Sequence, residues 1–148
     1  KPSHRKFVYG IHNNIPEGEP YPIRSINDGT HHYLLNLTPD ASYHEKHIMA
    51  EDSRLVWWVA MVEAAESGDE SAKALMEKYA RRPEEELYEV GVDRYETNNL
   101  ANNPEYALVK RRLRGELEKW MRSQRDPGAV LDTVEERDRL KVTSFPKK

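Results

Sequence analysis

The 148-residue sequence contains no cysteine, which excludes a disulfide framework and a thiol nucleophile. It also lacks any apolar run of membrane-spanning length, and no signal-like apolar segment opens it. Neither charge sign dominates, because 23 basic residues face 26 acidic ones and the net charge is −3. The strongly basic character typical of nucleic-acid-binding domains is therefore missing. We expect no membrane span and no nucleic-acid partner.

The composition fits about one domain with a modest core. Hydrophobic residues make up 37% of the chain and charged residues 33%, so much of the sequence must be solvated or lie in loops. The chain starts at Lys1 and enters a strand-like segment almost at once. We therefore expect it to be part of a longer protein.

The first half of the sequence predicts three strands. Residues 5–11, RKFVYGI, alternate apolar and polar positions and predict a half-buried strand. A loop rich in Pro, Gly and Asn follows. Residues 21–37, YPIRSINDGTHHYLLNL, predict a β-hairpin with Asp28 and Gly29 as a two-residue turn. On its returning strand Tyr33, Leu35 and Leu37 share one face.

Two helices and a fourth strand follow. Residues 51–66 predict a helix with Leu55, Trp58, Val59 and Val62 at helical spacing. The segment SGDES breaks the pattern, a second amphipathic helix follows, and Pro83 prevents its continuation. Residues 85–90, EELYEV, then predict a short strand. The helices form an insertion at about residues 51–82, between the third and fourth strands.

The last predicted helix has the clearest start signal. Asn103 suits the N-cap, Pro104 the first helical position, and Glu105 the positive end of the helix dipole. An apolar stripe that could cover a sheet follows, formed by Tyr106, Val109, Leu113, Leu117 and Trp120. The tail from Asp126 is polar and without periodicity. The predicted fold class is α+β, an antiparallel sheet of about four strands covered by a long C-terminal helix, with a helical insertion.

Several short motifs favour structural over chemical roles. His44 and His47 of HEKH could bind a metal on one helical face, but the segment is loop-like and no third ligand is near. His31 and His32 are adjacent in a strand and must point to opposite faces. The NLT triplet at Asn36 is a glycosylation sequon of a kind that often arises by chance. The basic face of the last helix could bind an acidic polymer, although acidic residues elsewhere favour a solvated face.

One loop has the character of a site. Residues 10–24 place polar side chains on irregular backbone between two strands, where ligands are often bound. The polar side chains are His12, Asn13, Asn14, Glu17 and Arg24. Arg24 could contact a sulfate or carboxylate through two nitrogens, or it could form a salt bridge within an ordinary connecting loop. No catalytic triad, phosphate-binding loop or paired carboxylates stand out, so the residues alone predict an α+β module without its own reaction centre.

Residues 86–106, ELYEVGVDRYETNNLANNPEY, resemble the C-terminal signature of the sulfatase family, in which E-L-Y-D-L leads to D-P-x-E-x-x-N-L-A and a helix. The matching residues are Glu86, Leu87, Tyr88, Asp93, Glu96, Asn99, Leu100 and Ala101. Glu89 replaces the usual Asp, and Arg94 the usual Pro. The hairpin resembles the Y-P-x-R-S segment of the family, and residues 117–128 resemble its W…D-P helix end. The combination most resembles the N-sulfoglucosamine sulfohydrolase (heparan N-sulfatase) branch.

The resemblance implies the C-terminal subdomain of an alkaline-phosphatase-like α/β sulfatase, over residues 1–130, with residues 131–148 as a polar tail. It implies an N-terminal catalytic domain as partner and a sulfated saccharide as substrate. The formylglycine nucleophile and the calcium ion would lie in that domain, because the chain has no C/S-x-P-x-R motif. We therefore assign no catalytic or metal-binding residue here. His12, Arg24 and Asp126 are the predicted substrate-binding residues.

Two other functions stay open at this point. The chain could be a non-catalytic module that binds sulfated or acidic glycans, or a structural domain that forms a homodimer. The sulfatase reading implies a periplasmic, secreted or lysosomal location, because sulfated polysaccharides are met there. It also implies that the isolated segment is inactive.

Overall fold

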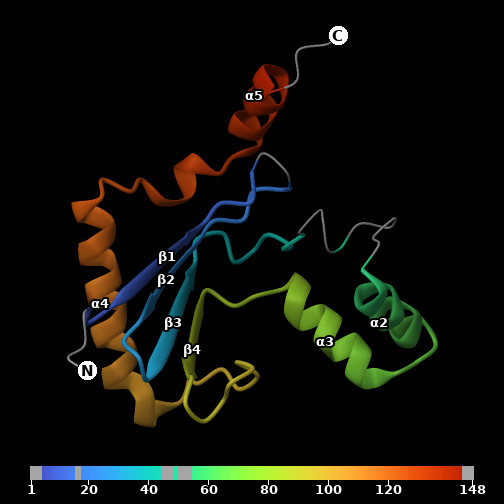
Figure 1. Cartoon of the computed structure of the whole chain (residues 1–148), viewed down its shortest axis with the longest axis horizontal. Helices are drawn as coiled ribbons and strands as arrows, with labels where there is room; N and C mark the ends of the chain where they lie inside the picture. Colours follow the sequence, from blue (N-terminus) through green and yellow to red (C-terminus); the bar gives the residue numbers. More distant parts are fainter. Residues whose placement is uncertain (1–4, 16–17, 45–48, 50–54, 145–148) are drawn as a thin grey trace.

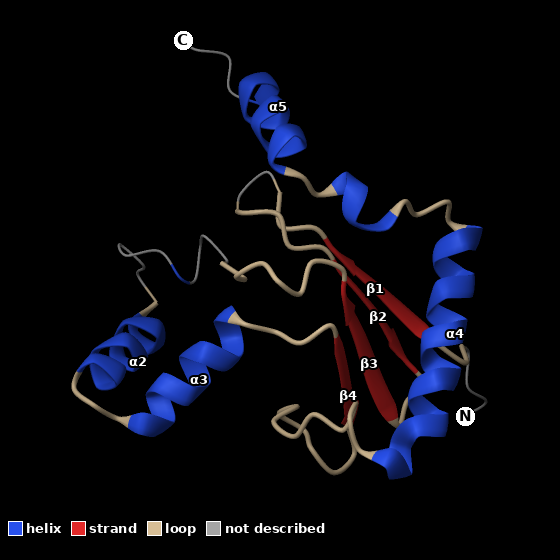
Figure 2. Ribbon diagram, turned by 180° about the vertical axis from the view of Figure 1, so that it is seen from behind, coloured by secondary structure: helices blue, strands red, loops and turns tan. Residues whose placement is uncertain are grey.

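The structure is a computed structural model that describes residues 5–15, 18–44, 49 and 55–144. Its core is a four-stranded antiparallel sheet in the order β1-β2-β3-β4. The strands are β1 Val8–His12, β2 Ile23–Asn27, β3 His31–Asn36 and β4 Glu85–Glu89. The long helix α4, Ala107–Ser123, lies across one face of this sheet (Figures 1 and 2). The predicted α+β class and helix-covered sheet are confirmed.

The main core lies between the sheet and α4. Ile26, Tyr33, Leu87, Leu113 and Leu117 are fully buried there. At one end, Tyr9 of β1 stacks on Trp120 of α4 with ring centroids 4.6 Å apart. The apolar stripe of the helix therefore covers the sheet as the sequence predicted.

Side chains on the opposite sheet face form a second, smaller cluster. Tyr21, Ile23, Leu34 and Tyr88 are buried in it, and Tyr43 packs against them from the chain that follows β3. Tyr88 and its neighbour Leu87 thus serve opposite faces, as alternation along a strand requires. Both faces of the sheet therefore carry buried side chains, although Val8 and Ile11 of β1 are exposed.

The hairpin between β2 and β3 turns one residue later than predicted. Asp28 N donates to His31 O, so Gly29 and Thr30 are the two central residues. Gly29 has φ +91°, which glycine adopts without strain, and glycine is preferred at the first position of one hairpin turn type. The Asp28 carboxylate accepts hydrogen bonds from Thr30 N and His31 N, which excludes it from the turn centre.

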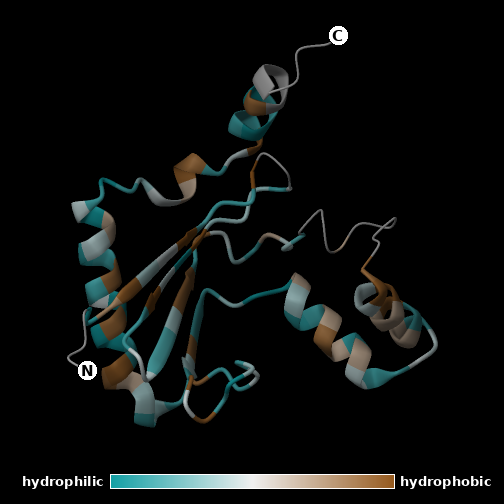
Figure 3. Cartoon of the chain, in the orientation of Figure 1, coloured by the Kyte–Doolittle hydropathy of each residue, from teal (hydrophilic) through white to brown (hydrophobic). Residues whose placement is uncertain are grey.

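The inserted helices pack on each other beside the β4 edge of the sheet. They are α2, Val56–Glu66, and α3, Glu70–Ala80. Asp69 caps α3 by accepting from Ser71 N and Ala72 N, and Trp58 of α2 is buried with its ring against Tyr79. Figure 3 shows α2 as strongly apolar, yet Val56 is 81% exposed. The predicted insertion is confirmed, while residues 51–54 of the predicted first helix lie outside the described residues.

The segment after β4 contains one expected and one unexpected feature. Asn103 caps a single 3-10 turn, η1 Pro104–Tyr106, before α4 begins, and its side chain accepts from Glu105 N. The predicted tail instead contains a 3-10 turn, η2 Gly128–Leu131, and a helix, α5 Val134–Ser144. This helix has no apolar stripe that sequence reasoning could detect, and local pairs such as Arg139 with Glu136 support it. Within the described ranges no helix has both the length and the apolar character to cross a bilayer.

Candidate functional site

The loop between β1 and β2 is held from outside by the C-terminal segment. Asp132 follows η2, is 2% exposed, and accepts hydrogen bonds from Asn14 N at 3.0 Å and Tyr21 N at 2.8 Å. Arg137 of α5 pairs with Glu19 of the same loop. A carboxylate that bridges two backbone N–H groups fixes both ends of a loop at once. The conformation of this loop therefore depends on residues more than 110 positions away.

Arg24 and Asp126 form a buried ion pair at the base of the loop. Arg24 Nε donates to Asp126 Oδ2 at 2.5 Å, and one Nη donates to Oδ1 at 3.0 Å. The other Nη contacts Asn13 Oδ1 at 2.9 Å and the carbonyl of Ile23 at 3.0 Å. The Arg24 hydrogen bond holds the pKa of the Asp126 carboxyl below its ordinary value, with burial opposing. In the structure Arg24 therefore forms a salt bridge, which was one of its two predicted roles.

Asn14 organises the middle of the loop. Its side chain is buried, and Nδ2 donates to Glu19 O at 2.7 Å and His44 O at 2.8 Å. A Cβ on Gly18 would lie 2.4 Å from this nitrogen, which explains why a glycine occupies the position. Internal hydrogen bonds therefore hold the described residues of the loop together.

The three predicted substrate-binding residues are brought together at one end of the sheet. Arg24 contacts Asp126 directly and reaches the carbonyl of His12 at 3.3 Å. The His12 ring lies edge-on to Tyr43, with centroids 5.9 Å apart. Their contact with a substrate stays a prediction. Sequence reasoning missed Asp132, because a lone aspartate in a non-periodic tail carries no signal.

The other histidines do not form a metal site in the described part of the chain, where no group of three potential ligands occurs. His32 Nδ1 lies 2.7 Å from Glu96 Oε1, whereas His31 packs edge-on against Tyr106. Of the HEKH motif, His44 is exposed, and His47 lies outside the described residues. The two adjacent histidines thus have separate structural partners, as predicted.

Asn36 of the sequon is unavailable for glycosylation in this fold. It is 1% exposed, and its Nδ2 donates to Pro83 O and to Glu86 Oε1. Glycosylation would require this nitrogen to be exposed and free of both bonds. The sequon is therefore a chance match.

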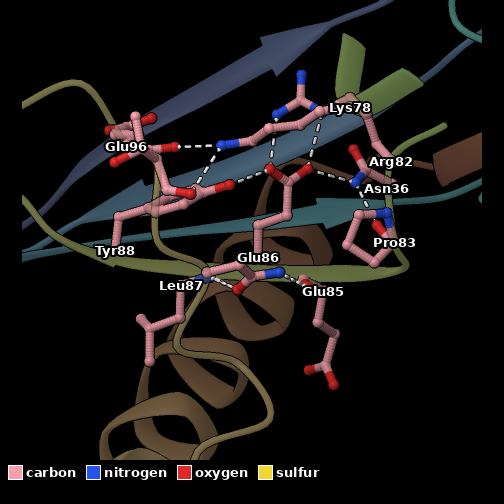
Figure 4. A network of polar contacts seen from close by, with 11 residues as sticks. Asn36, Lys78, Arg82, Pro83, Glu85, Glu86, Leu87, Tyr88 and Glu96 are labelled. Atoms are coloured by element: carbon pink, nitrogen blue, oxygen red, sulfur yellow. Dashed lines mark hydrogen bonds and ion pairs between the residues drawn. The ribbon is translucent and has the colours of Figure 1, made fainter. Parts of the chain in front are cut away.

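Glu86 is the centre of a polar network on the sheet face away from α4 (Figure 4). Its carboxylate accepts from Arg82 Nε at 2.8 Å, Arg82 Nη2 at 3.1 Å, Tyr88 Oη at 2.6 Å and Asn36 Nδ2 at 2.8 Å. Burial alone would raise the pKa of Glu86, but the hydrogen bonds from Arg82 and Tyr88 outweigh it and the pKa lies below its ordinary value. The network holds a charged carboxylate in place and links β3, β4 and the end of the insertion.

Three basic residues of α4 are paired with acidic ones. Arg112 pairs with Asp28, Lys110 with Glu85, and Arg114 with both Glu85 and Glu118. These pairs favour the interpretation of a solvated, charge-balanced face over a docking surface for an acidic polymer.

Comparison with known proteins adds a relationship that the geometry alone does not give. No family model matches the chain. Two curated relatives, both from Formosa agariphila and both named ulvan-active sulfatase, match it. One is 29% identical over 126 residues, covering 81% of this chain and 22% of its own length. The other is 27% identical over 121 residues, covering 82% of this chain and 20% of its own length.

The chain is similar to sulfatases over about four fifths of its length. It spans about a fifth of the length of the curated relatives it matches. Their names support the sulfatase relationship, but they do not support the heparan N-sulfatase branch that the motifs indicated. The sulfatase-like signature ELY…NLA itself corresponds to β4 and the turn segment that precedes η1.

Proposed function

We propose that this chain is the C-terminal part of a sulfatase that hydrolyses sulfate esters of a sulfated polysaccharide. The observation that carries the proposal is the similarity to two ulvan-active sulfatases over about four fifths of the chain. The folded sheet and its covering helix would complete the parent enzyme. The nucleophile and the metal would lie in the remaining part, as formylglycine and calcium in an N-terminal catalytic domain.

The loop between β1 and β2 is the part of this chain that we propose to face the saccharide. The hydrogen bonds that hold its described residues support this role, because a binding loop must hold its shape before the ligand arrives. Arg24 and Asp126 would act by fixing the base of the loop, and Asp132 by fixing its two arms. His12 would lie at the edge of the substrate pocket. A sulfated polysaccharide as substrate would imply a parent protein in the periplasm, outside the cell or in a lysosome.

The substrate class is tested with the full-length natural protein that carries this chain. Release of sulfate is measured from an aryl sulfate, from ulvan and from N-sulfoglucosamine. We expect hydrolysis of the aryl sulfate and of ulvan, whose bonds are sulfate esters. Hydrolysis of N-sulfoglucosamine alone would overturn the ester proposal and assign the protein to sulfamate cleavage.

The glycan-binding module is the second candidate, because sequence reasoning assigned no catalytic residue to this chain. It predicts binding of ulvan without release of sulfate from any of the three compounds. The same assay with a binding measurement on ulvan distinguishes it from the sulfatase proposal.

A further inference from the structure

A pocket lies between α3, β4 and the loop that follows β4. It has a volume of about 180 Å³ and opens to solvent. The inserted helix α3 provides one wall with Lys78 and Tyr79, and the loop provides the other with Tyr95. Neither the sequence motifs nor the proposed function assigns a ligand to this pocket.

The polar side chains on the floor of the pocket are already paired with one another. Arg82 and Glu86 form a two-point ion pair, and Tyr88 donates to the same carboxylate (Figure 4). The Glu86 side chain is only 5% exposed. A ligand therefore meets a preformed polar surface that does not need to reorganise.

Lys78 is the cation that this pocket leaves without a carboxylate. Its Nζ donates to the carbonyls of Glu96 at 2.9 Å and Thr97 at 3.1 Å, and lies 5.8 Å from the centre of the Tyr88 ring. An ammonium group has three donors, so two carbonyls leave one N–H for a ligand. No carboxylate of the described residues lies within ion-pair distance of this nitrogen, whereas Lys73 on the same helix is paired with Glu70. The carbonyls hold the charge in position without neutralising it.

Aromatic rings form the rim. Tyr95 is 81% exposed and Tyr79 is 44% exposed, although tyrosine rings usually bury most of their area. Both line the same pocket. Flat apolar rings beside fixed polar groups suit a ligand with an apolar face and a polar edge, as a sugar ring has.

We infer that this pocket binds one sugar residue that carries a negative group, with Lys78 contacting the sulfate or carboxylate and Tyr95 packing on the ring. Together with the proposed function, it becomes a subsite that holds the polysaccharide on this segment of the enzyme. A negative group suits this pocket because Lys78 forms no ion pair with a described acid and keeps one N–H for a charge-assisted hydrogen bond.

The test uses the full-length natural protein in affinity electrophoresis. The gels contain dextran sulfate, alginate or dextran, which offer sulfated, carboxylated and uncharged sugars respectively. We expect retardation by dextran sulfate, by alginate, or by both, and none by dextran; the pattern distinguishes sulfate from carboxylate. Lys78→Gln and Tyr95→Ala should each raise the apparent dissociation constant about tenfold, as loss of one charge-assisted or aromatic contact would.

Matched controls lie beside each tested residue. Lys73→Gln changes a lysine of α3 outside the pocket, and Val92→Ala changes a residue of the same loop that is 82% exposed. Both should keep the affinity of the unchanged protein, and Lys78→Arg should retain most of it. Should Lys78→Gln disturb folding, the exposed position of Tyr95 keeps the test decisive.

Unchanged affinity in both Lys78→Gln and Tyr95→Ala would overturn the inference, as would equal retardation by dextran or none by any gel. Hydrolysis of an aryl sulfate by the same preparation reports on the proposed function separately. Sulfate release with unchanged affinity in the two variants would leave the proposed function standing and remove the subsite. Lowered affinity without sulfate release would do the reverse.

Discussion

At the scale of single residues, buried charges hold the distant parts of this chain together. The side chains of Arg24 and Asp126 are 0% and 4% exposed, and they connect β2 to the chain after α4. A charge in such a place is stable only while its partner remains. The pair therefore ties the loop between β1 and β2 to the C-terminal segment.

Replacing Asp126 by Asn should destabilise the chain by about 3 kcal/mol, because the Arg24 charge would stay buried without its counter-ion. The measurement is the free energy of unfolding in urea. The double variant Arg24→Met/Asp126→Leu should lose less unfolding free energy than Asp126→Asn alone. If the double variant loses as much unfolding free energy as the single variant, or more, this account is contradicted.

The stability of the chain should fall in acid partly through Asp28. Burial opposes ionisation, but hydrogen bonds from Arg112 and from two backbone N–H groups lower the pKa of Asp28 to about 2. Because the folded pKa is depressed, this stabilisation is present above the unfolded pKa of about 4 and is lost as pH falls towards 2. Asp28→Asn should therefore flatten the pH dependence of unfolding between about pH 4 and pH 2. An unchanged slope in that range would contradict it.

Sequence reasoning identified Arg24 as a notable residue, but it did not predict that Arg24 pairs with Asp126. Arg24 and Asp126 are 102 positions apart, and no local pattern relates two positions so distant. The sequence was compatible with ligand binding and with a salt bridge at Arg24, and only the fold shows the salt bridge. The role of Asp132 was invisible for the same reason.

At the scale of elements, the turn after β4 works as a clamp on that edge strand. Asn99 Oδ1 accepts from Leu87 N and Ala101 N, Asn99 Nδ2 donates to Glu85 O, and Leu100 N donates to Leu87 O. These bonds supply partners to backbone groups that an edge strand would otherwise leave unpaired. The asparagine-rich signature is therefore structural.

Asn99→Ala should cost about 1–3 kcal/mol of unfolding free energy, because it leaves strand N–H and C=O groups without partners. Asn98→Ala is the matched control, since Asn98 is exposed and uses its backbone N–H to bond Asp93. Urea denaturation of both variants measures the difference. Equal effects of the two substitutions would show that the clamp does not stabilise the strand.

The helix α4 offers a similar comparison for the core. Leu113→Ala should cost about 2–5 kcal/mol, because the side chain is fully buried against the sheet. Leu108→Ala on the same helix should cost far less, because Leu108 is 75% exposed. Thermal unfolding of the two variants provides the measurement. A comparable loss for both would place α4 elsewhere than on the sheet.

The elements with periodic patterns could be predicted from the sequence, and those without could not. The stripe from Tyr106 to Trp120 predicted both α4 and its position, since five apolar residues at helical spacing need a surface to cover. The hairpin was predicted one residue early because Asp28-Gly29 is also a good turn pair by composition. The helix α5 was missed because its polar sides carry no periodic signal.

At the scale of the whole molecule, the chain is a sheet with a covering helix on one face and a helical hairpin at its edge (Figures 1 and 2). Its sulfatase relatives are about five times longer than the matched segment. The sequence predicted this relationship through the ELY…NLA and D-P motifs, but the heparan N-sulfatase branch that it also predicted is not supported by the names of the relatives. We predict that the isolated chain is inert towards aryl sulfates.

The most direct test of the sulfatase account is the release of inorganic sulfate from ulvan by the full-length natural protein, quantified by ion chromatography with the isolated chain as control. We predict sulfate release by the full-length protein and none by the isolated chain. A properly folded full-length protein that releases no sulfate from ulvan or an aryl sulfate would contradict the account.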